Sequence, residues 1–456
     1  MKNISRRQFV RTTSAAMGAV TVPLILPSCG PNSKKRPNDK ITMGFIGMGI
    51  QNRFLLRGFI SHEKIRVLAV CDVDTTRREL ARNYVDSFYE QNLEGEMPAK
   101  CLASSDFMEL INNDEIDAIS IATPDHWHAY QTIAALRAGK DVYCEKPLTH
   151  NIHEAIKVMK AVDKYNRVLQ TGSMQRSMPE FRLACELVRG GAIGKIDQVF
   201  CNFGVPGVPC DLPEEEMEPG LDWDMWIGPG PMRPYSSVLS PRGMHDHFPH
   251  WRNYKEYGGG MVCDFGAHHL DIAQWGLGMD DSGPVKVTPP KDPEAVTGAV
   301  LTYANGITVT QKNLDRAAVI FEGSKGIVTV DRSKFELILE DELICSYRKQ
   351  WDEPKEPEET LENALAIAEE AVPEEQKLRL YKSDNHLVDF IKCVQTREKP
   401  ITSEQVGARS AICCHLMNQA YYNHSEFEWD PDRLRLAKGS GSPEWLTRDY
   451  REPWVV

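Results

Sequence analysis

Short apolar runs alternate with longer amphipathic stretches along the first third of this 456-residue chain. The apolar stretches expected as buried strands are residues 41–46, 65–70 (IRVLAV), 117–124 (DAISIATP) and 141–147 (DVYCEKP). Apolar residues recur at helical spacing between them, in RFLLRGFI (53–60) and HWHAYQTIAALRAG (126–139). Alternating strands and helices of this length predict an α/β fold with a parallel, doubly wound sheet.

The second half of the chain has a different pattern, which predicts a second domain. AVTGAVLTYANGITVTQKN (295–313) and VIFEGSKGIVTVD (319–331) have the pattern of strands linked by turns, whereas CDFGAHHLDIAQW (263–275) has helical spacing. A chain of this length also exceeds one ordinary core. We therefore expect three parts: an N-terminal segment (1–40), a dinucleotide-binding domain (41–165) and a substrate-binding α/β domain (166–456).

Composition excludes several classes of protein. The formal net charge is -12, with 53 Lys and Arg against 65 Asp and Glu, so the surface would repel a nucleic-acid backbone. The 12 cysteines contain no C-x-x-C pair, which argues against a zinc ribbon or a thioredoxin-type site. Most cysteines are therefore expected to be small buried hydrophobic residues, and no metal is expected.

The N-terminus resembles an export signal. Arg6 and Arg7 stand in SRRQFVR, the order of a twin-arginine signal, and a short apolar stretch follows. LPSC resembles a lipobox, which would make Cys29 a lipid-bearing residue. We therefore expect export to the periplasm, with a membrane anchor at Cys29 as an option. The periplasm contains little free NAD. An exported protein that uses NAD would therefore have to bind this cofactor before export and retain it.

A glycine turn follows the first strand. Gly47 permits the tight turn, and Gly49 lets a pyrophosphate approach the backbone at the start of a helix. The third glycine position of the usual fingerprint holds Asn52. This strand–turn–helix unit predicts dinucleotide binding.

Asp72 ends the second strand, where a carboxylate accepts hydrogen bonds from the adenosine ribose. A carboxylate also repels a 2′-phosphate, which favours NAD over NADP, although Arg77 and Arg78 leave NADP open. Ligands of a parallel sheet bind at the carboxyl ends of its strands. The residues expected to bind NAD are Gly47, Gly49, Ile50, Gln51, Asn52, Asp72, Thr123, Pro124, Asp125, His126, His128, Glu145 and Lys146.

Several motifs together resemble the Gfo/Idh/MocA family, named for glucose–fructose oxidoreductase and inositol dehydrogenase. They are the glycine turn, ATPDHWH, EKPL, LDWDMWIGPGP and YGGGMVCDFGAHHLD, and the resemblance extends from about residue 41 to the C-terminus. It implies a Rossmann domain joined to an α/β domain with a large, open, mostly antiparallel sheet. It also implies NAD, a sugar or polyol substrate and a homo-oligomer.

The resemblance assigns Lys146, Asp264 and His268 to the active site. We expect His268 to be the general acid/base, since histidine titrates near neutral pH. Lys146 would stabilise charge on the reacting oxygen. Asp264 and His268 are four residues apart in a helical pattern, so we expect Asp264 to orient His268.

The stretch MHDHFPHWRNYKEY, just before the glycine run, is rich in polar and aromatic residues that suit a polyhydroxylated ligand. The residues expected to contact substrate are Arg176, His245, Trp251, Tyr257 and His268. Two alternatives stay open here. His245 and His247 could share a metal with Asp246 or His250, and Trp223 and Trp226 could stack on a sugar, although packing at the domain joint is the preferred interpretation.

Three functions are compatible with these features. The first is a dehydrogenase acting on a ring hydroxyl of a sugar or glycoside, with C3 as the favoured position. The second is a redox-neutral glycosidase or lyase that works through a transient 3-keto sugar, like the exported NAD-dependent α-N-acetylgalactosaminidases. The third is a non-catalytic NAD-bound lipoprotein. QTGSMQRS and MHDHFPHW do not resemble the glycosidase subgroup, and retention of the three active-site residues argues against the third, so we rank the dehydrogenase first.

Overall fold

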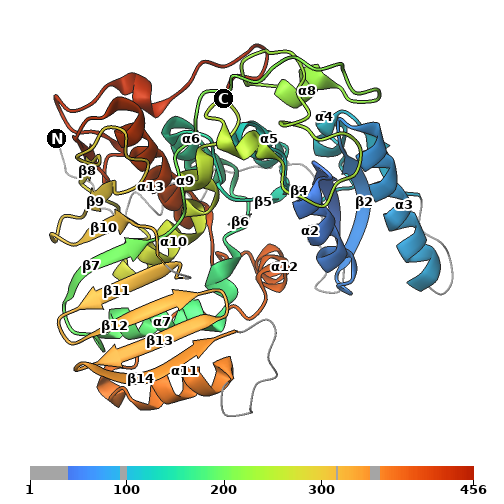
Figure 1. Ribbon diagram of the computed structural model, residues 1–456. Coiled ribbons are helices and arrows are strands. Elements are labelled where there is room, and N and C mark those ends of the chain that lie inside the picture. The colour runs from blue at the N-terminus through green and yellow to red at the C-terminus, as the bar shows by residue number, and fades with distance from the viewer. Residues whose placement is uncertain (1–39, 93–99, 315–316, 350–359) are drawn as a thin grey trace, which may run out of the picture. The chain divides into compact units, whose positions relative to one another are not determined.

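The computed structural model describes residues 40–92, 100–314, 317–349 and 360–456 (Figure 1). The chain divides into residues 1–39 and a compact unit of residues 40–456, and only the second unit is described here. The export features predicted at Arg6, Arg7 and Cys29 therefore lie outside the described residues. No helix in the described ranges has the length and apolar character needed to cross a membrane.

The first part of the compact unit is a parallel six-stranded sheet in the order β3-β2-β1-β4-β5-β6. The strands are β1 (Ile41–Ile46), β2 (Ile65–Cys71), β3 (Leu102–Ser104), β4 (Ala118–Ile121), β5 (Asp141–Cys144) and β6 (Leu169–Thr171). Its helices are α2 (Ile50–Ile60), α3 (Thr75–Asn92), α4 (Phe107–Ile111), α5 (Asp125–Arg137) and α6 (Ile152–Tyr165). The two central strands are almost wholly buried, as their continuous apolar runs require in a parallel sheet covered on both faces. The predicted α/β Rossmann architecture is confirmed.

The boundary expected at residue 165 divides this domain too early. β6 lies beyond that position and pairs with β5. In addition, α12 (His386–Thr396), from near the C-terminus, packs on α2, and the ring of Phe390 lies 5.9 Å from that of Phe59. The core of the Rossmann domain is therefore completed by a helix that follows the second domain in the sequence.

The second part is a ten-stranded sheet in the order β14-β13-β12-β11-β7-β10-β9-β8-β15-β16. Its strands are β7 (Ile196–Cys201), β8 (Lys286–Thr288), β9 (Val300–Thr302), β10 (Thr308–Gln311), β11 (Val319–Gly323), β12 (Gly326–Asp331), β13 (Lys334–Leu339), β14 (Glu342–Arg348), β15 (Phe427–Asp430) and β16 (Arg435–Leu436). All neighbouring pairs are antiparallel except β7 and β10. This confirms the large, mostly antiparallel sheet.

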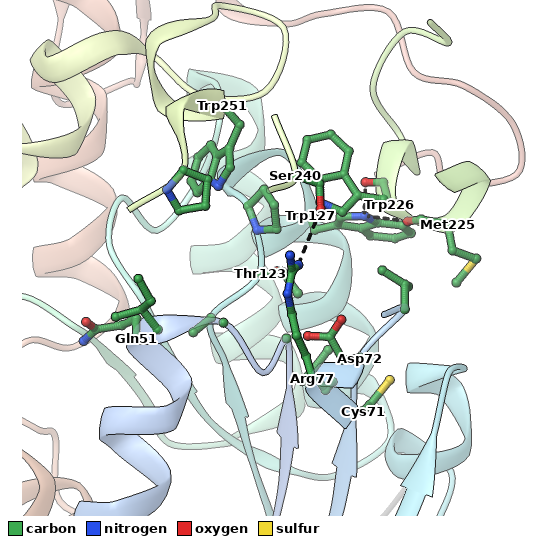
Figure 2. Close-up of a pocket in the computed structure, with 18 of the residues that line it drawn as sticks. Gln51, Cys71, Asp72, Arg77, Thr123, Trp127, Met225, Trp226, Ser240 and Trp251 are labelled. Atoms are coloured by element: carbon green, nitrogen blue, oxygen red, sulfur yellow. Dashed lines mark hydrogen bonds between the residues drawn. The ribbon is translucent and has the colours of Figure 1, made fainter. Parts of the chain in front are cut away.

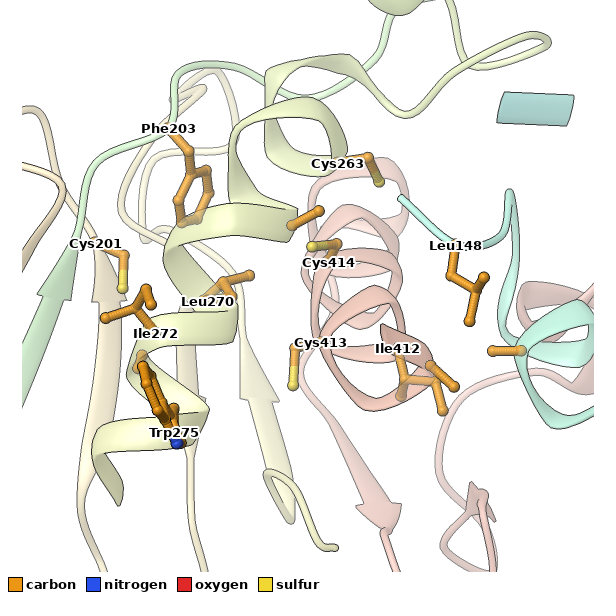
Figure 3. Close-up of a cluster of buried hydrophobic side chains, with 14 of the residues drawn as sticks. Leu148, Cys201, Phe203, Cys263, Leu270, Ile272, Trp275, Ile412, Cys413 and Cys414 are labelled. Atoms are coloured by element: carbon orange, nitrogen blue, oxygen red, sulfur yellow. The ribbon is translucent and has the colours of Figure 1, made fainter. Parts of the chain in front are cut away.

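Helices cover one face of this sheet and join it to the Rossmann domain. They are α7 (Pro179–Gly190), α9 (Gly260–Asp264), α10 (Gly266–Leu277), α11 (Leu361–Glu370) and α13 (Glu404–Asn423), and single 3₁₀ turns lie at Met174–Ser177, Glu374–Gln376 and Pro443–Leu446. Figure 3 shows α10 between the sheet and α13, with Leu270 and Cys413 in one buried cluster. α10 lies so close to the sheet that a Cβ on Gly276 would fall 2.5 Å from the ring of Phe321. α13 also packs on α6, which links the two domains.

Between β7 and α9, residues 202–257 form a long segment that we call the cap. It contains α8 (Trp223–Ile227) and the 3₁₀ turn His250–Asn253, and it has a small hydrophobic core of its own. Trp223 and Trp226 are buried in that core and stack with ring centroids 4.6 Å apart, in agreement with the packing interpretation. The cap is bonded to the Rossmann domain, for example by the Thr75 N–H, which donates to the Gly220 carbonyl at 2.9 Å.

Candidate active site

The cap and the carboxyl ends of the parallel strands enclose two adjoining cavities. One is a narrow slot of about 100 Å³ beside the glycine turn (Figure 2), and the other is a wider cavity of about 470 Å³ that extends to the second domain. Gln51, Thr123, Trp251 and Arg252 line both. The slot and the wider cavity therefore adjoin at these residues.

The glycine turn fits a pyrophosphate. Gly47 has φ +82°, and a Cβ there would lie 2.8 Å from the side chain of Thr123, so only glycine is accommodated. A Cβ on Gly49 would meet nothing within 4 Å, which leaves open space in front of α2. No side chain caps the N-terminus of α2, so its N–H groups and the positive end of its dipole remain available to an anion.

Asn52 does not line the slot, contrary to the prediction that it binds the cofactor. It is fully buried, and its amide nitrogen donates to the Ile46 carbonyl at 2.9 Å. The hydroxyl of Ser120 donates to its amide oxygen at 2.8 Å. Asn52 therefore joins α2 to β1 and β4 by hydrogen bonds, where the third glycine of the fingerprint would permit close packing instead. Its neighbours Ile50 and Gln51 do line the slot, as expected.

Asp72 lies in the slot with its carboxylate tied to the turn. Its oxygens accept hydrogen bonds from the N–H groups of Met48 at 2.6 Å and Asp74 at 2.8 Å. Burial raises the pKa of Asp72, although Arg77 and these two N–H groups oppose that shift. The carboxylate keeps lone pairs for two ribose hydroxyls, as an NAD site needs.

The two arginines that left NADP open are both occupied. Arg77 reaches the cap, where its guanidinium donates to the carbonyls of Pro241 and Gly243 and to the hydroxyl of Ser240. Arg78 donates to the carbonyl of Asp72 at 2.8 Å. These contacts hold both guanidinium groups against the protein, which favours NAD.

The residues after β4 divide between the two cavities and the cap. Thr123 and Pro124 line the slot, whereas Asp125 and His128 line the wider cavity. The ring nitrogens of His128 lie 2.7 Å from the Pro147 carbonyl and 2.9 Å from the Thr123 carbonyl. His128 therefore fixes the EKP segment beneath the cavity.

His126 and Tyr257 are exceptions to the prediction, because both belong to the packing of the cap. The ring nitrogens of His126 lie 3.0 Å from the Trp226 carbonyl and 3.4 Å from the Tyr257 carbonyl. Tyr257 is fully buried, and its hydroxyl donates to the Pro231 carbonyl at 3.0 Å. Neither side chain lines the slot or the wider cavity, so His126 is not placed to bind cofactor and Tyr257 is not placed to bind substrate.

Lys146 and Asp264 meet across the domain interface in the wider cavity. The ammonium of Lys146 donates to the Asp264 carboxylate at 2.6 Å and to its backbone carbonyl at 2.8 Å. Arg252 of the cap lies 3.4 Å from the same carboxylate. Burial alone would raise the pKa of Asp264, but Lys146 and Arg252 outweigh it and hold this pKa below its ordinary value. Asp264 is therefore an ionised group that positions two cations.

The expected pairing of Asp264 with His268 is not observed among the described residues. α9 ends at Asp264 and α10 begins at Gly266, so the two residues do not share one continuous helix. Two full positive charges also compete for the carboxylate, and they attract it more strongly than a neutral imidazole does. Asp264 orients Lys146 rather than His268.

His268 lines the same cavity without a hydrogen-bond partner at its buried Nδ1 among the described residues. Burial, then the charge of Lys146 and then that of Arg332, holds the pKa of His268 well below its ordinary value. The imidazole is therefore neutral at neutral pH. A neutral imidazole beside a lysine can accept a hydroxyl proton while the ammonium stabilises the developing oxyanion.

Two family models match this chain. The Gfo/Idh/MocA oxidoreductase family model, described as an NAD-binding Rossmann fold, matches residues 41–173. The model of that family's C-terminal alpha/beta domain matches residues 204–340, and together they cover more than half of the chain. The chain belongs to the Gfo/Idh/MocA oxidoreductase family. Its cofactor is NAD, for which the slot has the glycine turn, free helix N–H groups and Asp72.

The chain is also similar, more distantly, to individual proteins and solved structures. A glycosyl hydrolase family 109 protein of Shewanella baltica is 27% identical over 214 residues, which is 43% of this chain and 45% of that protein. An aldose–aldose oxidoreductase of Caulobacter crescentus, solved with glycerol, has a TM-score of 0.55 at 20% identity, over 85% of this chain and 99% of that one. The WlbA dehydrogenase of Bordetella pertussis, solved with NADH and UDP-GlcNAcA, has a TM-score of 0.56 at 17% identity, over 86% and 100%. These structures share the fold, and this chain spans less than half the length of the curated relative.

The remaining predicted substrate residues of this Gfo/Idh/MocA protein lie in different places. Trp251 lines both cavities, and His245 lines the slot rather than the wider cavity. Arg176 lines neither, because its guanidinium is buried in ion pairs with Asp271 at 2.8 Å and Asp280 at 2.6 Å. Arg176 is therefore a core cation that fixes α10, and its prediction as a substrate residue was wrong.

The alternative of a metal at the cap histidines finds no support in the geometry. His245 and His247 face one another at 4.8 Å between ring centroids, but Nδ1 of His245 donates to the His247 carbonyl at 2.7 Å. Asp246 is almost fully exposed, and its nearest cation is Arg53 at 3.6 Å. Within the described ranges, no group of three or more His, Cys, Asp or Glu side chains is arranged to hold a metal ion.

Several residues of the wider cavity could not be recognised from the sequence. Phe54, Phe248 and Phe265 are large exposed apolar side chains at its wall, and Arg332 comes from the turn between β12 and β13. Phe54 and Phe265 lie in helical patterns, where an apolar residue normally indicates a core position. Arg332 has no local motif at all.

Proposed function

We propose that this protein is an exported, NAD-dependent oxidoreductase that oxidises or reduces a ring hydroxyl of a sugar or glycoside, with C3 as the favoured position. The observation that carries the proposal is the Lys146–Asp264 ion pair beside a neutral, unpartnered His268, in a cavity of about 470 Å³ that adjoins the nucleotide slot. A cavity of that size fits a small polyhydroxylated ligand.

Each group has one task in the proposed reaction. NAD, when bound, exchanges a hydride with the substrate carbon. His268 accepts the proton of the reacting hydroxyl, and in the reverse direction returns it. The Lys146 ammonium stabilises the negative charge that develops on the same oxygen. Asp264 holds Lys146 in place by the bonds described above, and Arg252 contacts the same carboxylate.

Two further observations support a sugar as the substrate. The wall of the wider cavity combines carboxylates, cations and aromatic side chains, the mixture that suits hydroxyl-rich ligands. Proteins with the same fold include an aldose–aldose oxidoreductase and a dehydrogenase solved with a UDP-sugar. Export is proposed from the twin-arginine motif at Arg6 and Arg7.

The glycosyl hydrolase family 109 relative favours a second candidate, a redox-neutral glycosidase or lyase. In that reaction, oxidation at C3 makes the proton on C2 more acidic, so a base removes it and the C1 substituent leaves by elimination. In the glycosidase, water then adds at C1 and a proton returns to C2, and in both reactions the hydride is returned to C3. The same three residues serve this reaction, and no external acceptor is needed.

One experiment separates these candidates. The mature chain, purified without added nucleotide, is denatured to identify the nucleotide it carries, and the native protein is incubated with a panel of glycosides. A product lighter by two hydrogens supports the dehydrogenase, whereas cleavage without net oxidation supports the glycosidase. If the protein carries NAD but every glycoside of the panel stays unchanged, the result supports a non-catalytic protein.

Export has its own test. Arg6→Lys combined with Arg7→Lys should keep the protein in the cytoplasm, because the translocase recognises the arginine pair. Cys29→Ala should release a membrane-bound form if Cys29 carries a lipid. Unchanged fractionation of the double arginine variant would contradict export by this route.

A further inference from the structure

Three cations border the wider cavity, and they are not equivalent. Lys146 and Arg252 both lie against the carboxylate of Asp264, at 2.6 and 3.4 Å. Arg332 also lines the cavity, but no carboxylate of the described ranges lies within 4.0 Å of its guanidinium. Arg332 is therefore a cavity cation without an ion pair among the described residues, although the neighbouring Asp331 carboxylate lies within its field.

Arg332 is an exposed residue, but contacts constrain both its backbone and its side chain. It follows the last residue of β12, and its backbone N–H donates to the Asp331 carboxylate at 2.7 Å. Its guanidinium lies over the ring of Phe265, 5.9 Å from the centroid. This cation–π contact limits the positions that the guanidinium can take.

Gln175 connects this cation to the reacting group. Gln175 is fully buried, and in the amide orientation that satisfies both of its ends the nitrogen donates to the His268 carbonyl at 3.2 Å. The oxygen then accepts from Nε of Arg332, also at 3.2 Å. This contact occupies Nε and leaves the two terminal amino groups of Arg332 to a ligand at a fixed distance from His268.

The charges of the cavity support the same conclusion. Lys146 and Arg332 both lower the pKa of His268, which places the imidazole within the field of both cations. Lys146 serves the reacting oxygen in the proposed function, so Arg332 is available for another part of the substrate. A guanidinium with two free amino groups matches a carboxylate in a bidentate arrangement.

We propose that the substrate is a sugar acid, free or as a glycoside, whose carboxylate binds Arg332 while a ring hydroxyl reacts at His268. This inference rests on the proposed function, because it assigns a substrate class to the same site. A sugar phosphate shares the anionic chemistry but carries close to two negative charges, and among the described residues Arg332 is the one cation at the cavity wall that makes no ion pair. The carboxylate is therefore the better match.

The test compares two substrates that differ only at C6, methyl β-D-glucuronoside and methyl β-D-glucoside, with glucose 6-phosphate as a third. The wild-type protein should turn over the glucuronoside with the highest kcat/KM. Arg332→Gln should lower kcat/KM for the glucuronoside roughly tenfold or more, mainly through KM, because a charge-assisted pair is lost. It should leave the glucoside within about twofold, and Arg332→Lys should restore part of the loss.

Lys334→Gln is the matched control, since Lys334 begins the next strand, carries the same charge and does not line the cavity. Retention of bound NAD and an unchanged melting temperature show that each variant is folded. Preference for the glucoside or for the phosphate overturns the proposal while the proposed function stands, and so does an equal effect of Arg332→Gln on both glycosides. Absence of turnover of every sugar contradicts the proposed function, and this inference with it.

Discussion

The nucleotide slot and the substrate cavity of this protein are built in different ways. The groups of the slot that fit the pyrophosphate and the ribose follow strands β1, β2 and β4 directly, so each stands in a short local motif, although the cap lines the other side of the slot. The substrate cavity collects Lys146 from the Rossmann domain, Arg252 from the cap, Asp264 and His268 from two consecutive helices and Arg332 from a distant hairpin. One region is therefore defined by local sequence, and the other by tertiary structure. Variants in the cavity should alter turnover with NAD retained, whereas variants in the slot should alter NAD binding.

The largest effect is expected from His268→Ala, which removes the proposed acid/base from the cavity. kcat should fall by roughly 10²–10⁴-fold, the usual scale of such catalysis, while bound NAD is retained. Steady-state kinetics and the nucleotide content of the purified protein measure both quantities. His247→Ala, a cap histidine that lines neither cavity, is the control. Near wild-type turnover in His268→Ala would show that Lys146, Asp264 and His268 have only a structural role.

The pH profile should identify the base. The pKa of His268 is lowered below 6.5, so the neutral, proton-accepting form is present above that pKa and is lost as the pH falls through it. The rate of alcohol oxidation should therefore rise with pH along a limb that lies below pH 6.5 in the wild type, and this limb should vanish in His268→Ala. If the pH-dependent limb persists in His268→Ala and disappears in Lys146→Met, Lys146 is the base and His268 is not.

Asp264→Asn should have a smaller effect than His268→Ala, because Asp264 acts by positioning Lys146. The amide keeps the shape but loses the charge-assisted bond, so kcat should fall by roughly 10- to 100-fold. KM should change little, since the residue is not expected to touch the substrate. An unchanged kcat would show that Lys146 is held well enough by its bond to the Asp264 backbone carbonyl.

In the slot, Asp72→Ala should weaken NAD binding by roughly tenfold or more, because bonds from the ribose hydroxyls to a carboxylate are lost. NADP binding should be unchanged or improved, since a repelling charge is removed. Calorimetry with both nucleotides on protein stripped of its cofactor measures this selectivity. A wild-type protein that already prefers NADP would contradict the role given to Asp72.

The smallest functional effect is expected from Asn52→Ala. This variant leaves the Ser120 hydroxyl without its partner in the core and removes one of the two bonds to the Ile46 carbonyl, which keeps the bond from the Ala122 N–H. The free energy of unfolding should therefore fall by about 1–3 kcal/mol. NAD affinity should stay close to that of the wild type, because Asn52 lies outside the slot. Denaturant unfolding and nucleotide titration separate the two effects, and a large loss of NAD affinity without a loss of stability would restore Asn52 to the cofactor site.

The sequence predicted the fold and the slot well because both depend on local order. The apolar runs before the glycine turn and Asp72 are continuous, as buried parallel strands require, and the turn itself needs glycine at Gly47. The domain boundary was less accurate, because β6 and α12 join the Rossmann core only through tertiary contacts.

The errors in the candidate site have the same origin. His126, Tyr257 and Arg176 are polar residues beside recognisable motifs, but burial and partners remote in sequence make them packing residues. The spacing of Asp264 and His268 predicted a contact on one helix, and Lys146, from another domain, takes that carboxylate instead. Arg332 could not be predicted, since a cation in a hairpin turn is normally a solvated charge.

The central claim is that this protein transfers a hydride between a sugar carbon and NAD at the Lys146–His268 cavity. It is tested most directly by incubating the NAD-containing protein with methyl glycosides of glucose and glucuronic acid that carry deuterium at every ring carbon, followed by mass spectrometry of the released nucleotide. The dehydrogenase candidate predicts nucleotide that gains one deuterium in the wild type, and far more slowly in His268→Ala, whereas the glycosidase candidate returns the deuteride and predicts cleaved glycoside with unlabelled nucleotide. Nucleotide that stays free of deuterium while both glycosides stay intact would contradict the account.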